Sequence, residues 1–361
     1  MKYALIGCGR IAVNHISAAC YNNLSIVGLC DVVEENIAKL CDKCKYYDDT
    51  PHYLDYREML EEVKPDLVSI ATDSGSHADI ALYCIEHGIH VIIEKPMAMS
   101  MADAEKIIKK SEEKGVKVGV CHQNRFNIAV QETKKAITEG RMGKLSHGSI
   151  HVRWNRDRDY YEQASWRGKW TSDGGALMNQ CIHGIDLLCW MFGYEVEEVY
   201  GTIRRQFHNY IETEDIGMAI LKFKNGAIGT VEGTVNVYPR NLEETLYVFG
   251  EKGTVKFGGK TANTIDVWDF AESKEDDIEL KGLCEKAGNI YGNGHIHVFK
   301  DFIHAIVENR SPYIDAWAGR NALEIVLAIY KSAKEGRPIR LPLGAFTSAD
   351  MKEHFKDLTV M

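Results

Sequence analysis

The first 122 residues alternate short apolar runs with amphipathic stretches, and this alternation constrains the fold more than any other feature of the chain. The apolar runs have the length of buried strands, while the stretches between them repeat apolar residues at the three- and four-residue spacing of helices. The predicted strands are Tyr3–Ile6, Ser25–Cys30, Leu67–Ala71, His90–Ile93 and Lys117–Cys121. The predicted helices are Ile11–Tyr21, Glu34–Cys44, Tyr56–Val63, His77–His87 and Ala102–Lys114. This order is typical of an α/β domain with a doubly wound parallel sheet, and Tyr46–Tyr47 is a candidate for a short extra strand.

The pattern changes after a linking helix at residues 128–139. From about residue 144 to residue 281 the chain consists of long alternating segments, which are typical of antiparallel strands. The predicted strands include Gly148–Trp154, Val196–Gln206, Gly217–Phe223, Ala227–Val237 and Glu244–Phe249. One embedded helix is predicted at Ala176–Met191, and two helices follow at Ile296–Glu308 and Ala318–Glu335. A chain of 361 residues favours two domains: the α/β domain at 1–122 and an α+β domain with a large, mostly antiparallel sheet at 123–343, followed by a tail at 344–361.

Charge and composition exclude several classes of partner. A net charge of −9 and a pI near 5.9 disfavour nucleic acids and anionic membranes, which both need a basic surface. No apolar run reaches the roughly 18 residues that span a bilayer, and Met1–Ile6 is predicted to be a first strand, not a signal peptide. The ten cysteines stand singly in apolar segments, as in a reducing compartment, so we expect a cytoplasmic protein. Cys41 and Cys44 form a C-x-x-C without other ligands nearby, and we predict no metal site.

The segment Gly7-Cys8-Gly9-Arg10-Ile11-Ala12 has the G-x-G-x-x-A pattern of a dinucleotide-binding loop. Gly7 permits a tight turn, and Gly9 lets the backbone approach a pyrophosphate at the helix N-terminus. Arg10 and Ile11 stand at the start of that helix, so we expect them to contact the cofactor as well. Because the loop follows the first predicted strand and opens a helix, the sequence predicts a Rossmann domain.

Asp31 ends the second predicted strand and indicates which dinucleotide is bound. A carboxylate at this place accepts hydrogen bonds from the adenosine ribose and repels a 2′-phosphate. Val32 and Val33 follow, so no arginine stands ready for that phosphate. NAD is therefore favoured over NADP as the cofactor.

Two later strand ends supply further candidate residues. Thr72 and His77 could line the nicotinamide ribose or the pyrophosphate; alternatively, the serines of this turn cap the next helix and His77 only begins it. Glu94-Lys95-Pro96 ends the strand His90–Ile93, because proline donates nothing to a ladder. Since ligands bind outside the carboxyl edge of such sheets, we expect Glu94 and Lys95 at the cofactor and Lys95 also at the substrate.

The embedded helix carries a second candidate for catalysis. It opens with Gly174-Gly175, and Asn179 and His183 stand four residues apart, so they are predicted to share one face, with Asp186 three residues further on. A lone histidine is usually a satisfied core residue, but the flexible entry and polar face, together with Lys95, favour a catalytic role. We predict that Asn179 and His183 contact the substrate.

Upstream, residues 153–161 and 166–170 concentrate arginines and aromatic residues. Aromatic faces stack on sugar or base rings, and guanidinium groups fit carboxylate or phosphate oxygens. Arg153, Tyr161 and Arg167 are therefore candidate substrate contacts. A solvated loop or a subunit contact explains the same composition equally well.

These motifs together resemble those of the glucose–fructose oxidoreductase/inositol dehydrogenase (Gfo/Idh/MocA) family over nearly the whole chain. The resemblance rests on the dinucleotide loop, Ala71–Ala81, Glu94-Lys95-Pro96, Asn124-Arg125-Phe126 and the glycine pair before His183-x-x-Asp186. It implies a Rossmann domain plus an open-faced sheet that often packs face to face in oligomers, so a homodimer or homotetramer is expected. It also implies that Lys95 and His183 flank the reacting hydroxyl beside the nicotinamide.

The resemblance also implies an activity. We expect an NAD-dependent dehydrogenase that oxidises a ring hydroxyl of a sugar or sugar nucleotide, with His183 as general base and Lys95 stabilising alkoxide charge. Residues 160–170 and 176–180 are similar to a branch that acts on the 3-hydroxyl of UDP-N-acetylglucosamine-type sugars or their uronic acids. Many polyol dehydrogenases of the family have an aspartate where this chain has Asn179, which lacks the charge. The rival expectations are a free-polyol dehydrogenase for inositol or an aldose, an enzyme with transient NAD oxidation, and a non-catalytic NAD-binding regulator.

Overall fold

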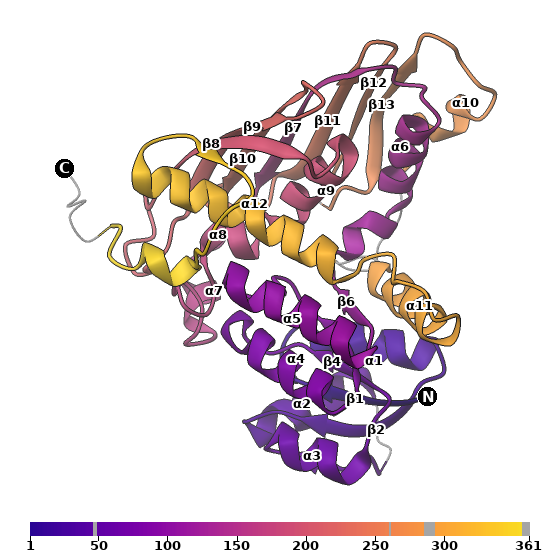
Figure 1. The fold of residues 1–361 in the computed structure, drawn as a ribbon, viewed down its shortest axis with the longest axis vertical. Helices are drawn as coiled ribbons and strands as arrows, with labels where there is room; N and C mark the ends of the chain where they lie inside the picture. The colour runs from indigo at the N-terminus through magenta and orange to yellow at the C-terminus, as the bar shows by residue number, and fades with distance from the viewer. Residues whose placement is uncertain (46–48, 260, 285–292, 356–361) are drawn as a thin grey trace. The chain divides into compact units, whose positions relative to one another are not determined.

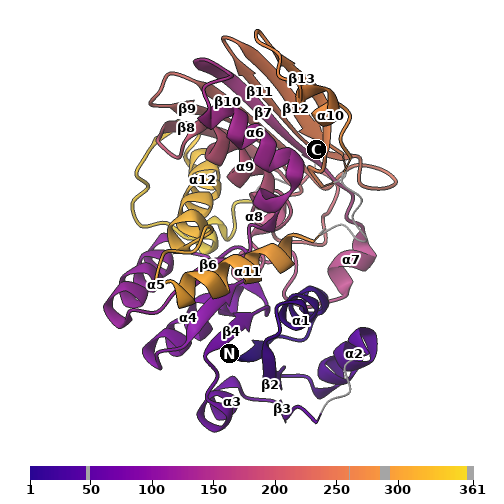
Figure 2. The same cartoon turned by 90° about the vertical axis from the view of Figure 1, so that its right-hand side faces the viewer.

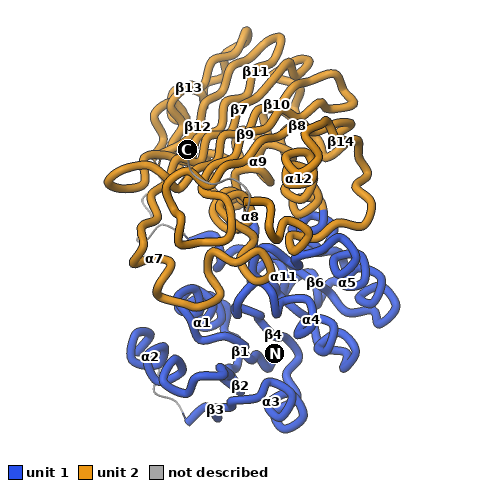
Figure 3. The backbone as a smooth tube through the Cα atoms, turned by 90° about the vertical axis from the view of Figure 1, so that its left-hand side faces the viewer, with its two compact units in different colours: residues 1–123, 293–320 blue, residues 124–292, 321–361 orange. Residues whose placement is uncertain are grey.

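The chain folds into two compact units, each with its own sheet (Figures 1 and 3). The structure, a computed structural model, describes residues 1–45, 49–259, 261–284 and 293–355. The first unit combines residues 1–123 with 293–320, and the second combines 124–292 with 321–361. The segment 293–320, which the sequence analysis placed in the second domain, thus packs with the first. Among the described residues, no helix has both the length and the apolar character that a membrane span requires.

The six strands of the first unit are all parallel, which confirms the predicted doubly wound sheet. Their order is β3-β2-β1-β4-β5-β6. The bounds are β1 Lys2–Ile6, β2 Ser25–Cys30, β3 His52–Tyr53, β4 Leu67–Ile70, β5 His90–Ile93 and β6 Val118–Val120. The order reverses between β1 and β4, and ligands of such sheets bind at this point, outside the carboxyl ends of the strands. β3 is an additional short strand, and the candidate strand Tyr46–Tyr47 lies outside the described residues.

Helices pack against both faces of this sheet, with α1 beside α11 and α4 beside α5 (Figure 2). The bounds are α1 Ala12–Tyr21, α2 Glu34–Cys44, α3 Tyr56–Val63, α4 His77–Glu86, α5 Met101–Lys114 and α11 Gly294–Val307. Local signals set the ends of these helices. Ser100 caps α5, because its Oγ accepts a hydrogen bond from Asp103 N at 3.1 Å, and Gly115 ends the helix with a φ of +66°.

The helix α11 joins the first unit through two buried phenylalanines. Phe299 meets Tyr3 edge to face, with 5.7 Å between ring centroids. Phe302 lies against Gly119 of β6, where a Cβ atom would sit 2.7 Å from the aromatic ring. Periodicity predicts the helix, but only these contacts decide which sheet it covers.

The second sheet has eight strands in the order β13-β12-β11-β7-β10-β9-β8-β14. β7 and β10 pair in parallel and the other neighbours are antiparallel, which confirms a mostly antiparallel sheet. The strands are β7 Leu145–Arg153, β8 Val196–Arg204, β9 Ile216–Phe223, β10 Ile228–Thr234, β11 Glu243–Gly250, β12 Gly253–Gly258, β13 Thr264–Phe270 and β14 Ile339–Arg340. The remaining α-helices are α6 Ile128–Thr138, α7 Arg158–Glu162, α8 Gly175–Asn179, α9 Ile182–Phe192, α10 Asp277–Leu280 and α12 Ala316–Glu335, the last of which begins in the first unit and continues into the second.

One face of this sheet is covered by helices and the other is open. α9 packs so closely that a Cβ atom at Gly184 would lie 2.8 Å from Ile150 of β7. The opposite face leaves four large apolar side chains about half exposed, at Tyr200, Met218, Ile220 and Ile228. The open-faced sheet implied by the resemblance is therefore present.

The described part of the expected C-terminal tail packs onto the second unit. Ser348 Oγ donates a hydrogen bond to Trp170 O at 2.7 Å, and the ring of Phe355 stacks on Trp170 with centroids 6.2 Å apart. Met351 and Phe355 are both buried. Residues 344–355 thus contribute to the core of this unit.

Candidate active site

The glycine loop after β1 has the shape that a dinucleotide needs. Gly7 has a φ of +94°, and a Cβ atom there would lie 2.5 Å from the Ala71 backbone, so only glycine fits. A Cβ atom at Gly9, by contrast, would meet nothing within 4 Å. No described side chain caps the N-terminus of α1, and its first turn has no acidic residue. The first-turn N–H groups and the open space at Gly9 therefore fit a pyrophosphate, with Arg10 and Ile11 at the same helix start.

Asp31 links the end of β2 to this loop. Its Oδ2 accepts a hydrogen bond from Cys8 N at 2.8 Å, and its Oδ1 accepts from Val33 N at 2.9 Å and Asn36 Nδ2 at 3.1 Å. The carboxylate is thereby oriented at the place where an adenosine ribose binds in such folds. Asn36 supports this arrangement, but no motif in the sequence marks it.

Thr72 and His77 both lie in the segment after β4, but Thr72 is partly exposed and His77 is buried. Ser76 Oγ donates a hydrogen bond to Thr72 Oγ1 at 2.8 Å, and Thr72 stays partly exposed. His77 is buried, and burial lowers its pKa, so the ring is neutral. Its Nδ1–H donates to Pro96 O at 2.7 Å. His77 therefore supports the segment that carries Lys95, and Thr72 remains the exposed candidate of this turn.

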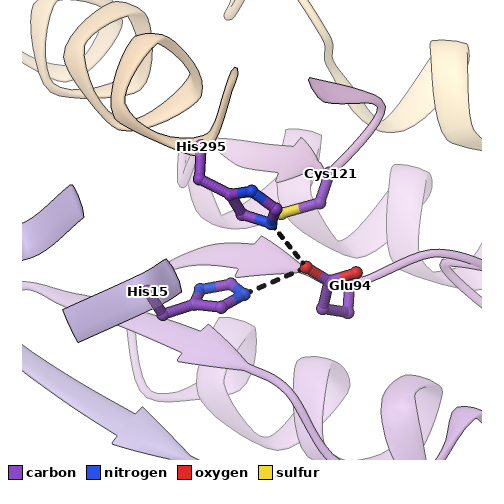
Figure 4. Close-up of side chains that lie close together, drawn as sticks. All are labelled: His15, Glu94, Cys121 and His295. Carbon is purple, nitrogen blue, oxygen red and sulfur yellow. Dashed lines mark hydrogen bonds and ion pairs between the residues drawn. The ribbon is translucent and has the colours of Figure 1, made fainter. Parts of the chain in front are cut away.

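Lys95 follows β5 and its backbone is held from both sides. On one side His77 binds Pro96, and on the other Lys95 N lies 3.3 Å from Glu94 Oε2. Glu94 points into a buried cluster, where its Oε1 accepts hydrogen bonds from His15 Nε2 at 3.0 Å and His295 Nε2 at 3.1 Å (Figure 4). Burial raises the pKa of Glu94, but these two hydrogen bonds outweigh burial and hold it well below its usual range. Glu94 is thus an ionised anchor inside the fold.

The helix predicted at Ala176–Met191 is in fact two helices, α8 and α9, and this corrects the placement of His183. Cys181 N donates to Ala176 O, five residues back, at 3.0 Å, which interrupts the four-residue hydrogen-bond ladder of a helix. Asn179 ends α8, whereas His183 lies in the first turn of α9 and is buried. The argument from a shared helix face was therefore wrong, although both residues belong to the second unit.

Asn179 is oriented by a carboxylate that the sequence analysis missed. Asn179 Nδ2 donates a short hydrogen bond to Asp173 Oδ1, and Gly168 N donates to Asp173 Oδ2 at 2.6 Å. Asp173 is only 1% exposed. The glycine pair after Asp173 is the only signal that pointed to this turn.

A second buried acid supports α8 from behind. Glu214 Oε1 accepts hydrogen bonds from Leu177 N and Tyr330 Oη, each at 2.8 Å, and Tyr330 Oη also contacts Gly174 O. Burial raises the pKa of Glu214 to about 8, so this acid is protonated at neutral pH. Together the two side chains hold the turn from which Asn179 projects.

Asp186 has a structural role rather than an exposed position on a polar face. It is fully buried, and Arg125 binds both of its oxygens, with Nε at 2.8 Å from Oδ2 and Nη2 at 2.6 Å from Oδ1. Tyr194 Oη makes a further short contact with Oδ1. This bidentate pair connects the Asn124-Arg125-Phe126 segment to α9 and so anchors the helix that carries His183.

The three predicted substrate contacts upstream differ in their surroundings. Arg153 is neutralised by two carboxylates of the sheet, with Nη2 at 2.5 Å from Glu232 Oε2 and Nη1 at 2.7 Å from Glu243 Oε1. Tyr161 is buried against other aromatic rings. Arg167 is partly exposed, and its guanidinium lies 4.0 Å over the ring of Tyr160.

Lys95 belongs to the first unit and His183 to the second. Each is supported within its own unit by buried hydrogen bonds, from Glu94 and His77 in one case and through the Arg125–Asp186 pair in the other.

Both halves of the chain match models of known protein domains. Residues 1–122 match the model of the oxidoreductase family with an NAD-binding Rossmann fold, and residues 130–256 match the GFO/IDH/MocA C-terminal domain. The structure of the WlbA dehydrogenase from Bordetella pertussis, in complex with NADH and UDP-GlcNAcA, is 37% identical. The match covers 95% of this chain and 98% of that one, with a TM-score of 0.86. The WlbA enzyme from Chromobacterium violaceum, in the same complex, is 34% identical over 95% and 96% of the two chains, with a TM-score of 0.87.

Relatives that act on free polyols are more distant in sequence. The myo-inositol 2-dehydrogenase of Thermotoga maritima is 25% identical over 94% of this chain and 98% of its own length. The named relatives act on sugar or polyol hydroxyls. The fold, the dinucleotide loop and these matches agree that the chain is a member of the Gfo/Idh/MocA family, an NAD-dependent oxidoreductase of sugars or polyols.

Proposed function

We propose that this enzyme oxidises the 3-hydroxyl of a UDP-N-acetylglucosamine-type sugar, or of its uronic acid, and transfers the hydride to NAD. Two solved relatives at 37% and 34% identity are complexes with UDP-GlcNAcA, whereas the inositol-acting relative is 25% identical. Similarity of this kind supports a substrate class, and the residues of the second unit give it a chemical basis.

The observation that carries this proposal is an unneutralised pair of arginines among aromatic rings. Arg156 lies 4.9 Å over both Trp154 and Tyr160, and Arg167 lies 4.0 Å over Tyr160. Among the described residues neither arginine has a carboxylate partner; Arg167 Nη1, for example, donates to Tyr160 O at 2.6 Å and to Gln163 Oε1 at 3.2 Å. Guanidinium groups of this kind suit a diphosphate or a carboxylate, and a free polyol offers neither. We therefore assign the anionic part of the substrate to Arg156 and Arg167 rather than to Arg153.

We assign the chemical step to Lys95 and His183. His183 accepts the proton of the ring hydroxyl, since imidazole is the side chain that most often serves as a general base near neutral pH. The Lys95 ammonium donates a hydrogen bond to the same oxygen and stabilises the negative charge that develops on it. NAD supplies the hydride acceptor. We also assign to Asn179, whose amide nitrogen is held by Asp173, a contact with the sugar.

The test is the absorbance of reduced nicotinamide after NAD-loaded protein is mixed with UDP-sugars and free polyols separately. We expect a signal with UDP-N-acetylglucosamine or its uronic acid, and a KM for that substrate at least about tenfold higher in Arg167→Met, since charge-assisted hydrogen bonds are strong. The matched control is Arg337→Met, an exposed arginine of the same unit that pairs with Glu335. A signal with inositol alone would instead support the free-polyol activity of the more distant relatives. Slow exchange of substrate hydrogen without accumulated NADH would indicate transient oxidation.

We further propose that a second copy of the chain covers the open face of the second sheet, in a homodimer or homotetramer. The half-exposed Tyr200, Met218, Ile220 and Ile228 give this face an apolar centre. Sedimentation of the wild type and of Ile220→Glu tests it, because a buried charge would shift the protein toward monomers. A wild type that sediments as a monomer at micromolar concentration would contradict this assembly.

A further inference from the structure

Four side chains with metal-binding chemistry meet inside the first unit (Figure 4). They are His15 of α1, Glu94 after β5, Cys121 after β6 and His295 of α11. One ligand atom from each lies within 4.8 Å of all the others, and all four side chains are buried, with Glu94 the most exposed at 9%. Neither the nucleotide loop nor the proposed substrate contacts use the two imidazoles or the thiol.

The spacing of the donor atoms is close to that of a coordination sphere. In a tetrahedral zinc site with bonds of about 2.0–2.3 Å, neighbouring donor atoms lie roughly 3.3–3.8 Å apart. His15 Nε2 and His295 Nε2 lie 3.0 and 3.1 Å from the same Glu94 oxygen. Binding of a cation would lengthen these two distances slightly. It would shorten the widest donor–donor distance, which is at most 4.8 Å, by about 1 Å.

The charges of the donor set also suit a divalent cation. A Glu94 carboxylate and a Cys121 thiolate would each contribute one negative charge, and the two imidazoles bind as neutral ligands. A divalent cation would therefore make the cluster neutral.

We propose that His15, Glu94, Cys121 and His295 form a structural site for one divalent transition-metal cation of the zinc class. The two imidazole Nε2 atoms, Glu94 Oε1 and the Cys121 thiolate fill four positions. As the cation binds, each imidazole exchanges its Nε2 proton for one on Nδ1, and the Cys121 proton passes to solvent. With no position left for water or substrate, the cation would stabilise the fold and take no part in hydride transfer. It would connect α1, which follows the dinucleotide loop, to α11, which joins this unit from a distant part of the chain. The proposal is independent of the substrate.

One feature limits the affinity that we expect. A metal-bound histidine usually donates its second N–H to an acceptor. His15 Nδ1 is buried and has no such partner among the described residues. Outer-shell partners of this kind are worth about 10–100-fold in metal affinity, so the site is expected to bind less tightly than a complete structural zinc site.

The experiment is a Co²⁺ titration of the full chain after dialysis against a chelator. We expect one equivalent of Co²⁺ to bind per chain, with a near-ultraviolet thiolate-to-cobalt absorption band and an increase in Tm. Cys121→Ser should lose the band and bind at least about tenfold more weakly, because the only thiolate ligand is removed. Cys84→Ser, a buried cysteine of the same unit, and Cys44→Ser, of the C-x-x-C, should keep both.

Two outcomes would overturn the proposal. The first is a wild type that binds no stoichiometric Co²⁺ and whose Tm is unchanged by it. The second is a band that persists in Cys121→Ser or disappears in Cys44→Ser. In either case the cluster is held by hydrogen bonds alone, with each imidazole donating Nε2–H to Glu94.

Discussion

Replacing Asn179 by aspartate would place a second carboxylate against the buried Asp173. In the wild type the amide of Asn179 donates to Asp173 Oδ1, and Gly168 N occupies the other oxygen. In Asn179→Asp the same contact joins two acids, which cannot both be ionised at that distance. The pair should therefore hold one shared proton over a wide range of pH.

The size of this effect follows from the separation and the burial of the charges. Two like charges about 4 Å apart repel by about 4 kcal/mol at an effective dielectric constant of 20. At 1.36 kcal/mol per pKa unit, this raises one pKa of the pair from about 3.9 to roughly 7. An acid whose pKa is higher in the folded state than in the unfolded state contributes its full stability at pH values below the unfolded-state pKa. That stability is lost as pH rises through the folded-state pKa. The variant should thus be destabilised by about 1.5 kcal/mol at pH 5 and about 4 kcal/mol at pH 8 relative to the wild type.

The assay is urea unfolding at pH 5 and pH 8, with kcat and KM measured at the same values. We expect the activity of the variant, relative to the wild type, to fall as pH rises through roughly 7, because the pair then loses the shared proton that holds residue 179 in place. The exchanged double variant Asp173→Asn/Asn179→Asp is the matched control. It keeps one charge, and the amide at position 173 can still accept from Gly168 N and donate to position 179. Equal destabilisation of the single variant at both pH values, or the same pH dependence in the double variant, would refute the reasoning.

The remaining predictions concern Lys95 and two buried acids. Lys95→Ala should lower kcat at least about 10²-fold, as expected for a charge-stabilising donor, while the affinity for NAD measured by fluorescence stays within about twofold. Replacement of the exposed Lys109 by alanine is the control, and substantial turnover in Lys95→Ala would exclude the assigned role. Glu214, whose pKa is raised to about 8, makes the fold less stable as pH rises toward 8, so Glu214→Gln should remove a slope of about 1.4 kcal/mol per pH unit between pH 5 and 8. If urea unfolding gives the wild type and Glu214→Gln the same change of unfolding free energy with pH, this prediction is contradicted. Arg125→Met leaves Asp186 buried without its partner and should cost about 3–5 kcal/mol, whereas an unchanged midpoint of denaturation would mean that water replaces the guanidinium.

The fold was predictable where it depends on local pattern. The bounds of α2, α3 and β5 follow from periodicity, capping and turn residues, and they agree with the structure. The break between α8 and α9 was not predictable, because it depends on one hydrogen bond from Cys181 N to Ala176 O inside an otherwise helical sequence. The same is true of α11, whose amphipathic pattern fits either sheet until Phe302 meets Gly119.

The positions of Gly7, Asp31 and Lys95 at the ends of strands were predictable, because the strand pattern alone places them there. Asp173 was missed because a turn with two glycines, and not a regular helix or strand, connects it to its partner Asn179. The ion-pair partners of Arg153 were missed for a related reason. Its sequence neighbours are cations and aromatics, but its partners Glu232 and Glu243 come from β10 and β11.

The return of the chain to the first unit at residues 293–320 has a consequence for synthesis on the ribosome. The sheet β1–β6 is complete at residue 120, but α11 begins only at residue 294. At translation rates of about 5–20 residues per second, the gap corresponds to roughly 10–35 s. During that time Tyr3 lacks Phe299, β6 lacks Phe302 and Glu94 has only one of its two imidazoles. The nascent nucleotide-binding domain therefore exposes an unfinished apolar edge, which is a natural target for chaperones, until most of the second domain has left the ribosome.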